Sequence, residues 1–120
     1  DTVFITTKHD LHAKFVQEAL ISGKNVFVEK PLAITSEEMD TIESIYDGSK
    51  SVTVGFNRRF SPHMMAVKHF LKDSREPISI SININAGYIP AESWVHDMEE
   101  GGGRIIGEAC HFLDLCVPMI

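Results

Sequence analysis

The stretch NVFVEKP, residues 25–31, decides the fold of this chain. Its apolar centre, VFV, is typical of a parallel strand buried inside a sheet. Open α/β sheets bind their ligands beyond the carboxyl ends of the strands, so we expect Glu29, Lys30 and Pro31 to lie at a binding site. Pro31 also ends the strand, because proline has no N–H to donate to the ladder.

Two more short apolar runs, residues 3–5 and 52–54, stand on either side of this strand in the sequence, and helical patterns separate the three runs. We expect the first helix to be capped by Asp10 and to end at Gly23. The second helix begins at Thr35, which stands three residues before a glutamate in a capping-box pattern. Strands that alternate with helices in this way predict an α/β fold with a parallel sheet.

The pattern changes beyond this point. Ser61 followed by proline predicts the start of a third helix. We expect the inward face of that helix to consist of Met64, Val67, Phe70 and Leu71. Isoleucines then alternate with serine and asparagine over residues 78–84, which predicts a strand with one apolar face, as in antiparallel sheets.

The change of pattern places a boundary between two sheet types near residues 57–62. We interpret the triple glycine at 101–103 as a flexible hinge, followed by a helix over about residues 107–115. The first residues run straight into a strand, so we expect the chain to be a piece of a longer protein.

The composition excludes several classes of protein. The chain has 120 residues and a net charge of −6, without a basic stripe, so we expect no nucleic acid partner. No apolar run is long enough to span a bilayer, and no secretory signal is present. The two cysteines, Cys110 and Cys116, do not share a helical face, so we expect free thiols and a cytoplasmic protein.

Polar side chains follow each of the three predicted strands. These are Thr6 and Thr7 after the first, residues 29–31 after the second and residues 55–59 after the third. Because the carboxyl ends of parallel strands meet at one edge of a sheet, we expect these side chains to form a polar crevice. The N-terminus of the first helix would favour an anionic or polar ligand there.

Two residues are the candidates for chemistry. Lys30, held at a strand end, can hydrogen-bond a substrate hydroxyl, although a surface lysine would also fit this position. His111 follows the triple glycine near a helix start, and histidine suits general base catalysis near neutral pH. The alternative for His111 is a core histidine paired with Asp114.

Other ligand sites have weaker support. Arg58 and Arg59 can hold a phosphate or a carboxylate, or form a solvated pair. The six histidines occur in no metal-binding motif, so we expect no metal site. The sequence also contains no Gly-x-Gly-x-x-Gly, so a pyrophosphate-binding loop would lie outside this chain.

Four segments together resemble the glucose–fructose oxidoreductase and inositol dehydrogenase (Gfo/Idh/MocA-type) family. They are residues 6–12 (TTKHDLH), 23–32 (GKNVFVEKPL), 55–62 (GFNRRFSP) and 101–115, which contain GGG and HFLDL. The resemblance implies that residues 1–58 are the C-terminal half of a Rossmann-type parallel sheet. Residues 59–120 would start an α+β domain with a mainly antiparallel open sheet, through which the protein forms a homo-oligomer.

The resemblance also implies an activity: NAD- or NADP-dependent hydride transfer to or from a sugar, cyclitol or related polyol carbon. Lys30 and His111 match the catalytic lysine and histidine, and the Lys30–Pro31 peptide bond would be cis. The cofactor-side positions of the family match Thr7, His12, Glu29 and Lys30, and also Asn57 and Arg58.

One position departs from the family pattern. Gly107 stands where the family often has an aspartate, one helical turn before His111. Either the neighbouring Glu108 replaces that aspartate through an irregular turn, or the site uses two residues. The alternative function is a non-catalytic scaffold or regulator that binds nucleotide or sugar. For the chain alone we expect weak dinucleotide binding, no turnover and self-association.

Overall fold

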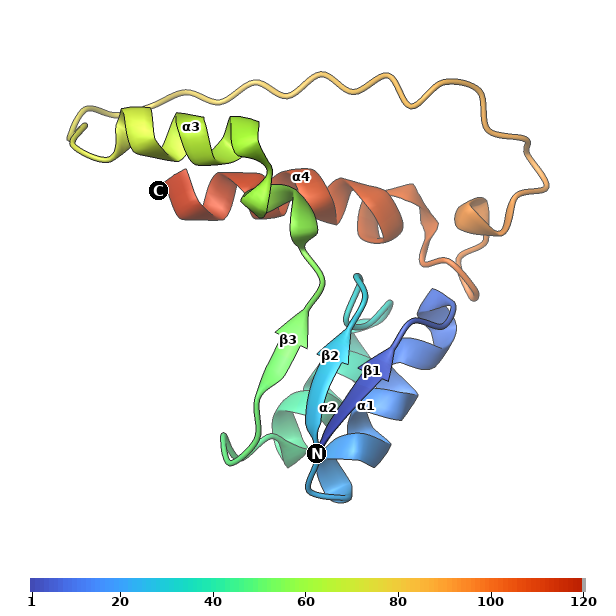
Figure 1. Ribbon diagram of the computed structural model, residues 1–120. Coiled ribbons are helices and arrows are strands. Elements are labelled where there is room, and N and C mark those ends of the chain that lie inside the picture. Colours follow the sequence, from blue (N-terminus) through green and yellow to red (C-terminus); the bar gives the residue numbers. More distant parts are fainter. Residues whose placement is uncertain (120) are drawn as a thin grey trace.

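Three short strands form a parallel sheet in the computed structural model, which describes residues 1–119 (Figure 1). They are β1 (Thr2–Ile5), β2 (Asn25–Val28) and β3 (Val52–Val54), and they lie in the order β1-β2-β3. The register pairs residue 5 with residue 28 and residue 28 with residue 54, so the carboxyl ends of the strands are level. The predicted α/β fold with a parallel sheet is confirmed.

Two helices cover one face of this sheet: α1 (His12–Ile21) and α2 (Ser36–Ile45) (Figure 1). The apolar core between helices and sheet consists of Ile5, Ala13, Val16, Ala19, Val26, Val28 and Ile42. The opposite face carries Phe4, which is 71% exposed and touches only one ring, that of Phe27, at 5.5 Å between centroids. Within residues 1–119, helices therefore pack on a single side of the sheet, and the buried strand predicted at residues 25–28 buries Val26 and Val28 on that side.

The ends of the first two helices follow local signals with one exception. Thr35 accepts the N–H of Glu38, whose side chain reaches back to the Thr35 N–H, so the capping box is confirmed. Gly23 ends α1 with a φ of 65°, a left-handed backbone that favours glycine. Asp10 is not the cap of α1, because it lies inside a 3-10 turn, His9–Leu11, that precedes the helix.

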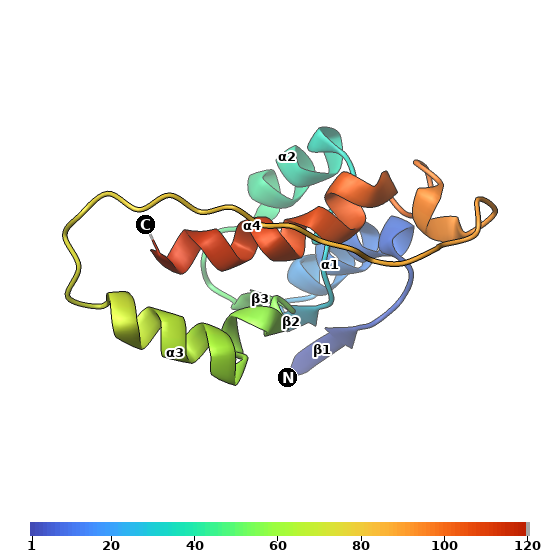
Figure 2. The ribbon, with the colours of Figure 1, turned by 90° about the horizontal axis from the view of Figure 1, so that it is seen from above.

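Beyond β3 the chain turns away from the sheet. A 3-10 turn (Asn57–Phe60) leads into α3 (Pro62–Leu71), where Ser61 accepts the N–H of Met64 as the predicted cap. A π-helical turn (Ile105–Ala109) leads into α4 (Cys110–Cys116), which lies beside α3 in both views (Figures 1 and 2). A short 3-10 turn, Val117–Met119, follows α4, and no helix of residues 1–119 is both long and apolar enough to cross a membrane.

Between α3 and α4 a long extended segment runs above the two helices in Figure 1, and seen from above it passes over α4 (Figure 2). Within the described residues it forms no strand, contrary to the prediction for residues 78–84, because no neighbouring strand offers it backbone partners. Phe70 on α3 is 85% exposed rather than inward, because none of residues 1–119 covers its ring. An apolar groove of about 590 Å³ lies between the segment and α3, α4; Met64, Val67, Leu71, Ile80 and Phe112 are among its lining residues.

Candidate functional site

The polar residues at the strand ends do converge. A cleft of about 360 Å³ opens beyond the carboxyl ends of β1 and β2 and is lined by Thr6, Thr7, Lys8, His9, His12, Glu29, Lys30 and Trp94. Its position agrees with the general rule for open parallel sheets, where ligands bind at this edge. The crevice expected from the sequence is therefore present at the ends of the first two strands. Residues 55–59 do not line it, whereas Trp94, from the loop before the triple glycine, does.

Lys30 joins this edge to the C-terminal helix. It follows β2 directly, and its peptide bond to Pro31 is cis, as the resemblance implies. Its ammonium nitrogen donates a hydrogen bond of 2.6 Å to the carbonyl oxygen of Gly107, 77 residues away in sequence. The same nitrogen lies 3.8 Å from a carboxylate oxygen of Glu108. With a side chain only 15% exposed, Lys30 is a buried contact of the second half of the chain rather than a surface lysine.

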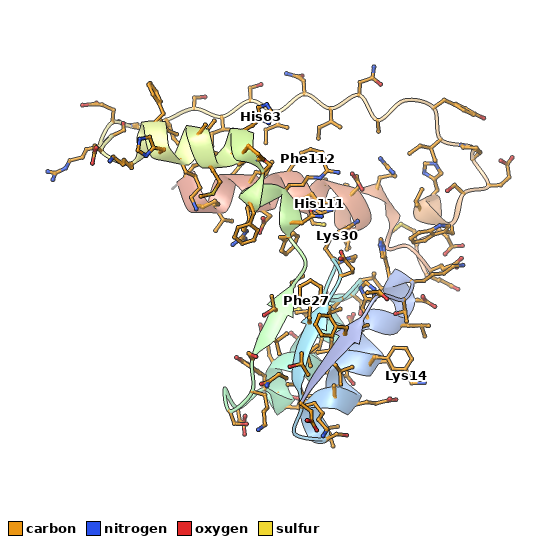
Figure 3. The ribbon with its side chains drawn as sticks, viewed as in Figure 1. Lys14, Phe27, Lys30, His63, His111 and Phe112 are labelled. Carbon is orange, nitrogen blue, oxygen red and sulfur yellow. The ribbon has the colours of Figure 1, made fainter. Side chains whose placement is uncertain are left out.

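His111 lies on α4 one turn beyond that contact, and Figure 3 places it beside Lys30 where α4 meets the edge of the sheet. The residue is 7% exposed, and its Nδ1 is buried without a hydrogen-bond partner among residues 1–119. Burial lowers the pKa of His111, and the cations of Lys30 and Arg58 lower it further. A neutral imidazole with an unused nitrogen, next to an ammonium group, can accept a proton from a ligand.

The alternative interpretation of His111, as a partner of Asp114, is wrong. Asp114 instead accepts hydrogen bonds from Arg59, one of them 2.9 Å long from Nε, in a two-point contact. The hydrogen bond to the Asp114 carboxylate raises the pKa of the Arg59 guanidinium. Arg58 and Arg59 each hold a carboxylate, as one of the two interpretations expected, but both carboxylates belong to the C-terminal helical region of the chain itself.

The predicted cofactor-side residues fall into two groups. Thr7 and Asn57 are exposed and able to meet a ligand. His12 is fully buried: its Nδ1 is 2.7 Å from the Pro31 oxygen, and its Nε2 is 3.0 Å from the Thr7 oxygen. Its nitrogens therefore hold the ends of β1 and β2 together, which shapes the cleft without presenting a free polar atom to it.

Of the two remaining cofactor-side candidates, Glu29 lines the cleft, whereas Arg58 contacts the C-terminal helical region. The Glu29 carboxylate rests on Gly55, where an added Cβ would lie 3.0 Å from its Oε2, so the backbone of Gly55 makes room for it. Arg58 donates a hydrogen bond of 2.9 Å to Glu108, and its guanidinium lies 4.5 Å from the centre of the Phe112 ring. Arg58 thus binds the C-terminal helical region in the described chain.

The sequence did not indicate how the triple glycine docks. The imidazole Nδ1 of His9 is 2.8 Å from the Gly101 oxygen, and the ring meets Trp94 edge-on at 4.9 Å. Lys8 forms an ion pair with Glu100 beside this contact. The two residues of each pair are about ninety positions apart in sequence, so no local spacing pattern predicts these contacts.

The triple glycine is not a hinge, which corrects the interpretation from sequence. All three glycines are buried, and an added Cβ at Gly102 would lie 2.8 Å from Ile34. At Gly101 an added Cβ would lie 2.6 Å from the Trp94 oxygen. Glycine is therefore required here because the backbone packs closely against the loop after β2 and the turn at Trp94, and not because the chain must flex.

The two cysteines agree with the expectation from the sequence. Cys110 and Cys116 are free thiols, and burial raises the pKa of Cys110. No cluster of three metal-ligating side chains occurs within the described part of the chain.

Comparisons with known proteins identify the family. Residues 1–56 match the Gfo/Idh/MocA group, described as an oxidoreductase family with an NAD-binding Rossmann fold. Inositol 2-dehydrogenase of Rhizobium meliloti (strain 1021) is 38% identical over 76 residues, which is 62% of this chain and 23% of that protein. Inositol 2-dehydrogenase 2 of Saccharopolyspora erythraea is 36% identical over 96 residues, which is 76% of this chain and 28% of that protein.

Among solved structures, the WlbA dehydrogenase of Thermus thermophilus, in complex with NAD and UDP-GlcNAcA, superposes with a TM-score of 0.79 at 24% identity. The match covers 99% of this chain and 40% of that one, and at this identity it shows the fold alone. The chain thus spans about a quarter of the two inositol 2-dehydrogenases. The family match and these relatives lead to one conclusion: the chain belongs to the Gfo/Idh/MocA oxidoreductase family, and its first half is part of an NAD-binding Rossmann fold.

Proposed function

We propose that this chain supplies the catalytic half of an NAD- or NADP-dependent oxidoreductase that acts on a CH–OH carbon of a sugar, cyclitol or related polyol. The observation that carries the proposal is the meeting of Lys30 and His111. The lysine Nζ binds the Gly107 oxygen one helical turn before the histidine, and its charge lowers the pKa of that histidine. The inositol dehydrogenases among the relatives support a polyol as the class of substrate.

The two residues divide the chemistry. His111 accepts the proton of the substrate hydroxyl, and its lowered pKa keeps the ring neutral and ready to do so near neutral pH. Lys30 hydrogen-bonds the same oxygen and stabilises the negative charge that develops on it as the proton leaves. A bound nicotinamide supplies the hydride chemistry.

The residues present fit part of a dinucleotide site. The cleft beyond β1 and β2 offers the exposed Thr7 and the half-buried Glu29, and the Nδ1 of His111 on α4 is buried without a hydrogen-bond partner among residues 1–119. The 120 residues contain no Gly-x-Gly-x-x-Gly, so the pyrophosphate-binding loop would come from elsewhere in a longer polypeptide. The chain alone would bind dinucleotide weakly and show no turnover.

We propose the same division into two domains that the resemblance implies. Residues 1–58 would be the second half of the Rossmann domain, because the consecutive order β1-β2-β3 matches one half of a doubly wound sheet. An apolar depression of about 460 Å³ runs along β1 and α1, lined by Val3, Phe4 and Phe15 among others, and offers a place for the other half. Residues 59–120 would begin the substrate and oligomerisation domain, whose antiparallel sheet would include residues 78–84.

The test of the proposed function is Lys30→Ala in the complete protein, with Lys14→Ala as the control because Lys14 is exposed on α1. Turnover of NAD or NADP with a panel of polyols should fall roughly two to four orders of magnitude for Lys30→Ala, the scale of one lost electrostatic group. The control should behave like the wild type. Unchanged turnover in the Lys30 variant would contradict the proposal.

A second function is favoured by one observation, the glycine at position 107 where the family often has an aspartate. Such a chain could belong to a non-catalytic member that binds cofactor as a sensor or scaffold. NADH fluorescence distinguishes the two functions. A sensor would bind the cofactor without oxidising any polyol of the panel, whereas the oxidoreductase would do both.

A further inference from the structure

A carboxylate lies between two cations at the centre of the candidate site. Glu108 Oε1 accepts a hydrogen bond of 2.9 Å from Arg58, and its Oε2 lies 3.8 Å from Lys30 Nζ. The Glu108 side chain is 31% exposed, so solvent screens these contacts only in part. The three residues come from three separate places in the sequence: the end of β2, the turn after β3 and the π-helical turn before α4.

The backbone of the π-helical turn explains why the carboxylate stands at position 108. On a regular α-helix, neighbouring residues point about 100° apart, so an acid at 108 would not replace one at 107. The turn Ile105–Ala109 is π-helical, which changes this rotation, and such turns are frequent at functional sites. Both the Gly107 carbonyl and the Glu108 carboxylate consequently face Lys30.

Position 107 itself excludes a side chain. An added Cβ there would lie 2.9 Å from the Gly101 backbone oxygen and 3.2 Å from Cε1 of His9. Backbone atoms of the buried triple glycine cannot yield easily, because they are held by the docking contact with His9. An aspartate at 107 is therefore incompatible with this packing, and the glycine is a requirement of the site rather than a loss from it.

We propose that Glu108 is the positioning residue of the site and holds Lys30 and Arg58 in place. It thereby replaces, from one position later, the aspartate that the family often has at position 107. This inference rests on the proposed function. Of the two alternatives for the missing aspartate, it favours replacement by Glu108 through an irregular turn over a site that uses only two residues.

The charges around His111 show how Glu108 would act during the proton step. The charged groups that act on the ring are Lys30 and Glu29 from the end of β2, Arg58 from the turn after β3, and Glu108 from the π-helical turn. Asp114, on the same helix as His111, is paired with Arg59. Once His111 has accepted a proton, its imidazolium stands beside two cations. Glu108 and Glu29 offset that repulsion, and both raise the pKa of His111 against the effect of burial.

The first measurement needs no cofactor. Titration of the His111 ring by NMR in this chain should move to lower pH in Glu108→Gln, because the ring loses a carboxylate that favours its charged form. Glu43→Gln, an exposed glutamate on α2, is the matched control and should leave the titration in place. An unchanged His111 titration in a folded Glu108→Gln chain would overturn the inference.

The second measurement is the pH profile of kcat in the complete protein. Glu108→Gln should lower kcat roughly ten- to a hundredfold, with KM changed far less, and should move the acidic limb of the profile to lower pH. Glu108→Asp, which keeps the charge, should recover part of kcat and the wild-type limb. The exchange Gly107→Asp with Glu108→Gly should not recover kcat, because the packing at 107 admits no Cβ. Full activity of that exchange variant would contradict the inference.

The outcomes separate this inference from the proposed function. If Lys30→Ala abolishes turnover while Glu108→Gln keeps the wild-type kcat and pH profile, only the role of Glu108 fails. If Lys30→Ala is also without effect, the proposed function fails as well. Thermal unfolding and NADH affinity of each variant show whether it has folded. If the exchange variant does not fold, the recovery of kcat in Glu108→Asp relative to Glu108→Gln still decides the role of Glu108.

Discussion

Residues 1–56 and residues 57–119 differ in how they bury apolar side chains. Every buried apolar side chain in the described chain lies between Ile5 and Ile42, where two helices cover a parallel sheet. The later region has helices of similar length, yet Phe70 is 85% exposed and Ile80, Ile82 and Ile84 are 41–50% exposed. In the first region, the alternating strands and helices bury their apolar side chains against one another. In the later region, the helices and the extended segment leave apolar side chains exposed, which further structure would have to cover.

The candidate site lies where these two regions meet. Lys30 belongs to the region with the core, and Glu108 and His111 belong to the region without one. The junction contains polar contacts, such as Arg59 with Asp114 and His9 with Gly101, beside the packing of Gly102 on Ile34. The first region thus provides the edge of the sheet, and the second brings His111, the proposed general base, to it.

The largest expected difference between the regions is in the cost of truncating an isoleucine. Ile42→Ala, 4% exposed in the core, should lower the free energy of unfolding by about 3 kcal/mol. Ile80→Ala, 41% exposed in the extended segment, should lower it by less than about 0.5 kcal/mol. Urea unfolding of both variants measures the two costs. Equal losses would mean that the extended segment belongs to the same cooperative core.

Helix caps give a smaller effect that sharpens the comparison. Thr35→Ala removes a complete capping box from α2 and should lower the free energy of unfolding by about 1 kcal/mol. Ser61→Ala removes the matching cap from α3, a helix without a fully buried residue. We expect the second change to speed amide hydrogen exchange within α3 while the urea midpoint stays unchanged. A midpoint that falls equally in both variants would contradict the division.

The smallest expected effect is a pH dependence of the junction. Burial lowers the pKa of His9 below its ordinary value of 6.5, opposed by the contact with the Gly101 oxygen. The unfolded chain therefore binds more protons than the folded one just below pH 6.5. The contribution of His9 to stability is complete above that pH and declines as the pH falls toward the folded-state pKa.

Trp94, the one tryptophan of the sequence, reports this transition because it packs edge-on against His9. Acidification should change its fluorescence with a midpoint below pH 6.5. His9→Asn should remove the transition, and His63→Asn, an exposed histidine on α3, should retain it. A midpoint above 6.5, or a transition that survives in His9→Asn, would show that another group is responsible.

Local patterns predicted much of the first region and little of how the second one packs. The strand before Lys30, the box at Thr35 and the cap at Ser61 depend on residues a few positions apart, so they could be located without coordinates. The expected strand over residues 78–84 could not form by itself, because a strand needs a hydrogen-bonded neighbour. The interpretation of 101–103 as a hinge was wrong for a related reason: its close neighbours are distant in sequence.

Strand ends and caps could be inferred from short stretches, since backbone geometry and capping act within one turn of the chain, whereas the cis Lys30–Pro31 bond was expected only from the family resemblance. The shared environment of Lys30, Glu108 and His111 arose only on folding. The lysine reaches across 77 residues to the Gly107 carbonyl, and a π-helical turn orients the carboxylate beside it. Contacts of that range depend on how two regions dock, and docking leaves no periodic pattern in the residues that take part.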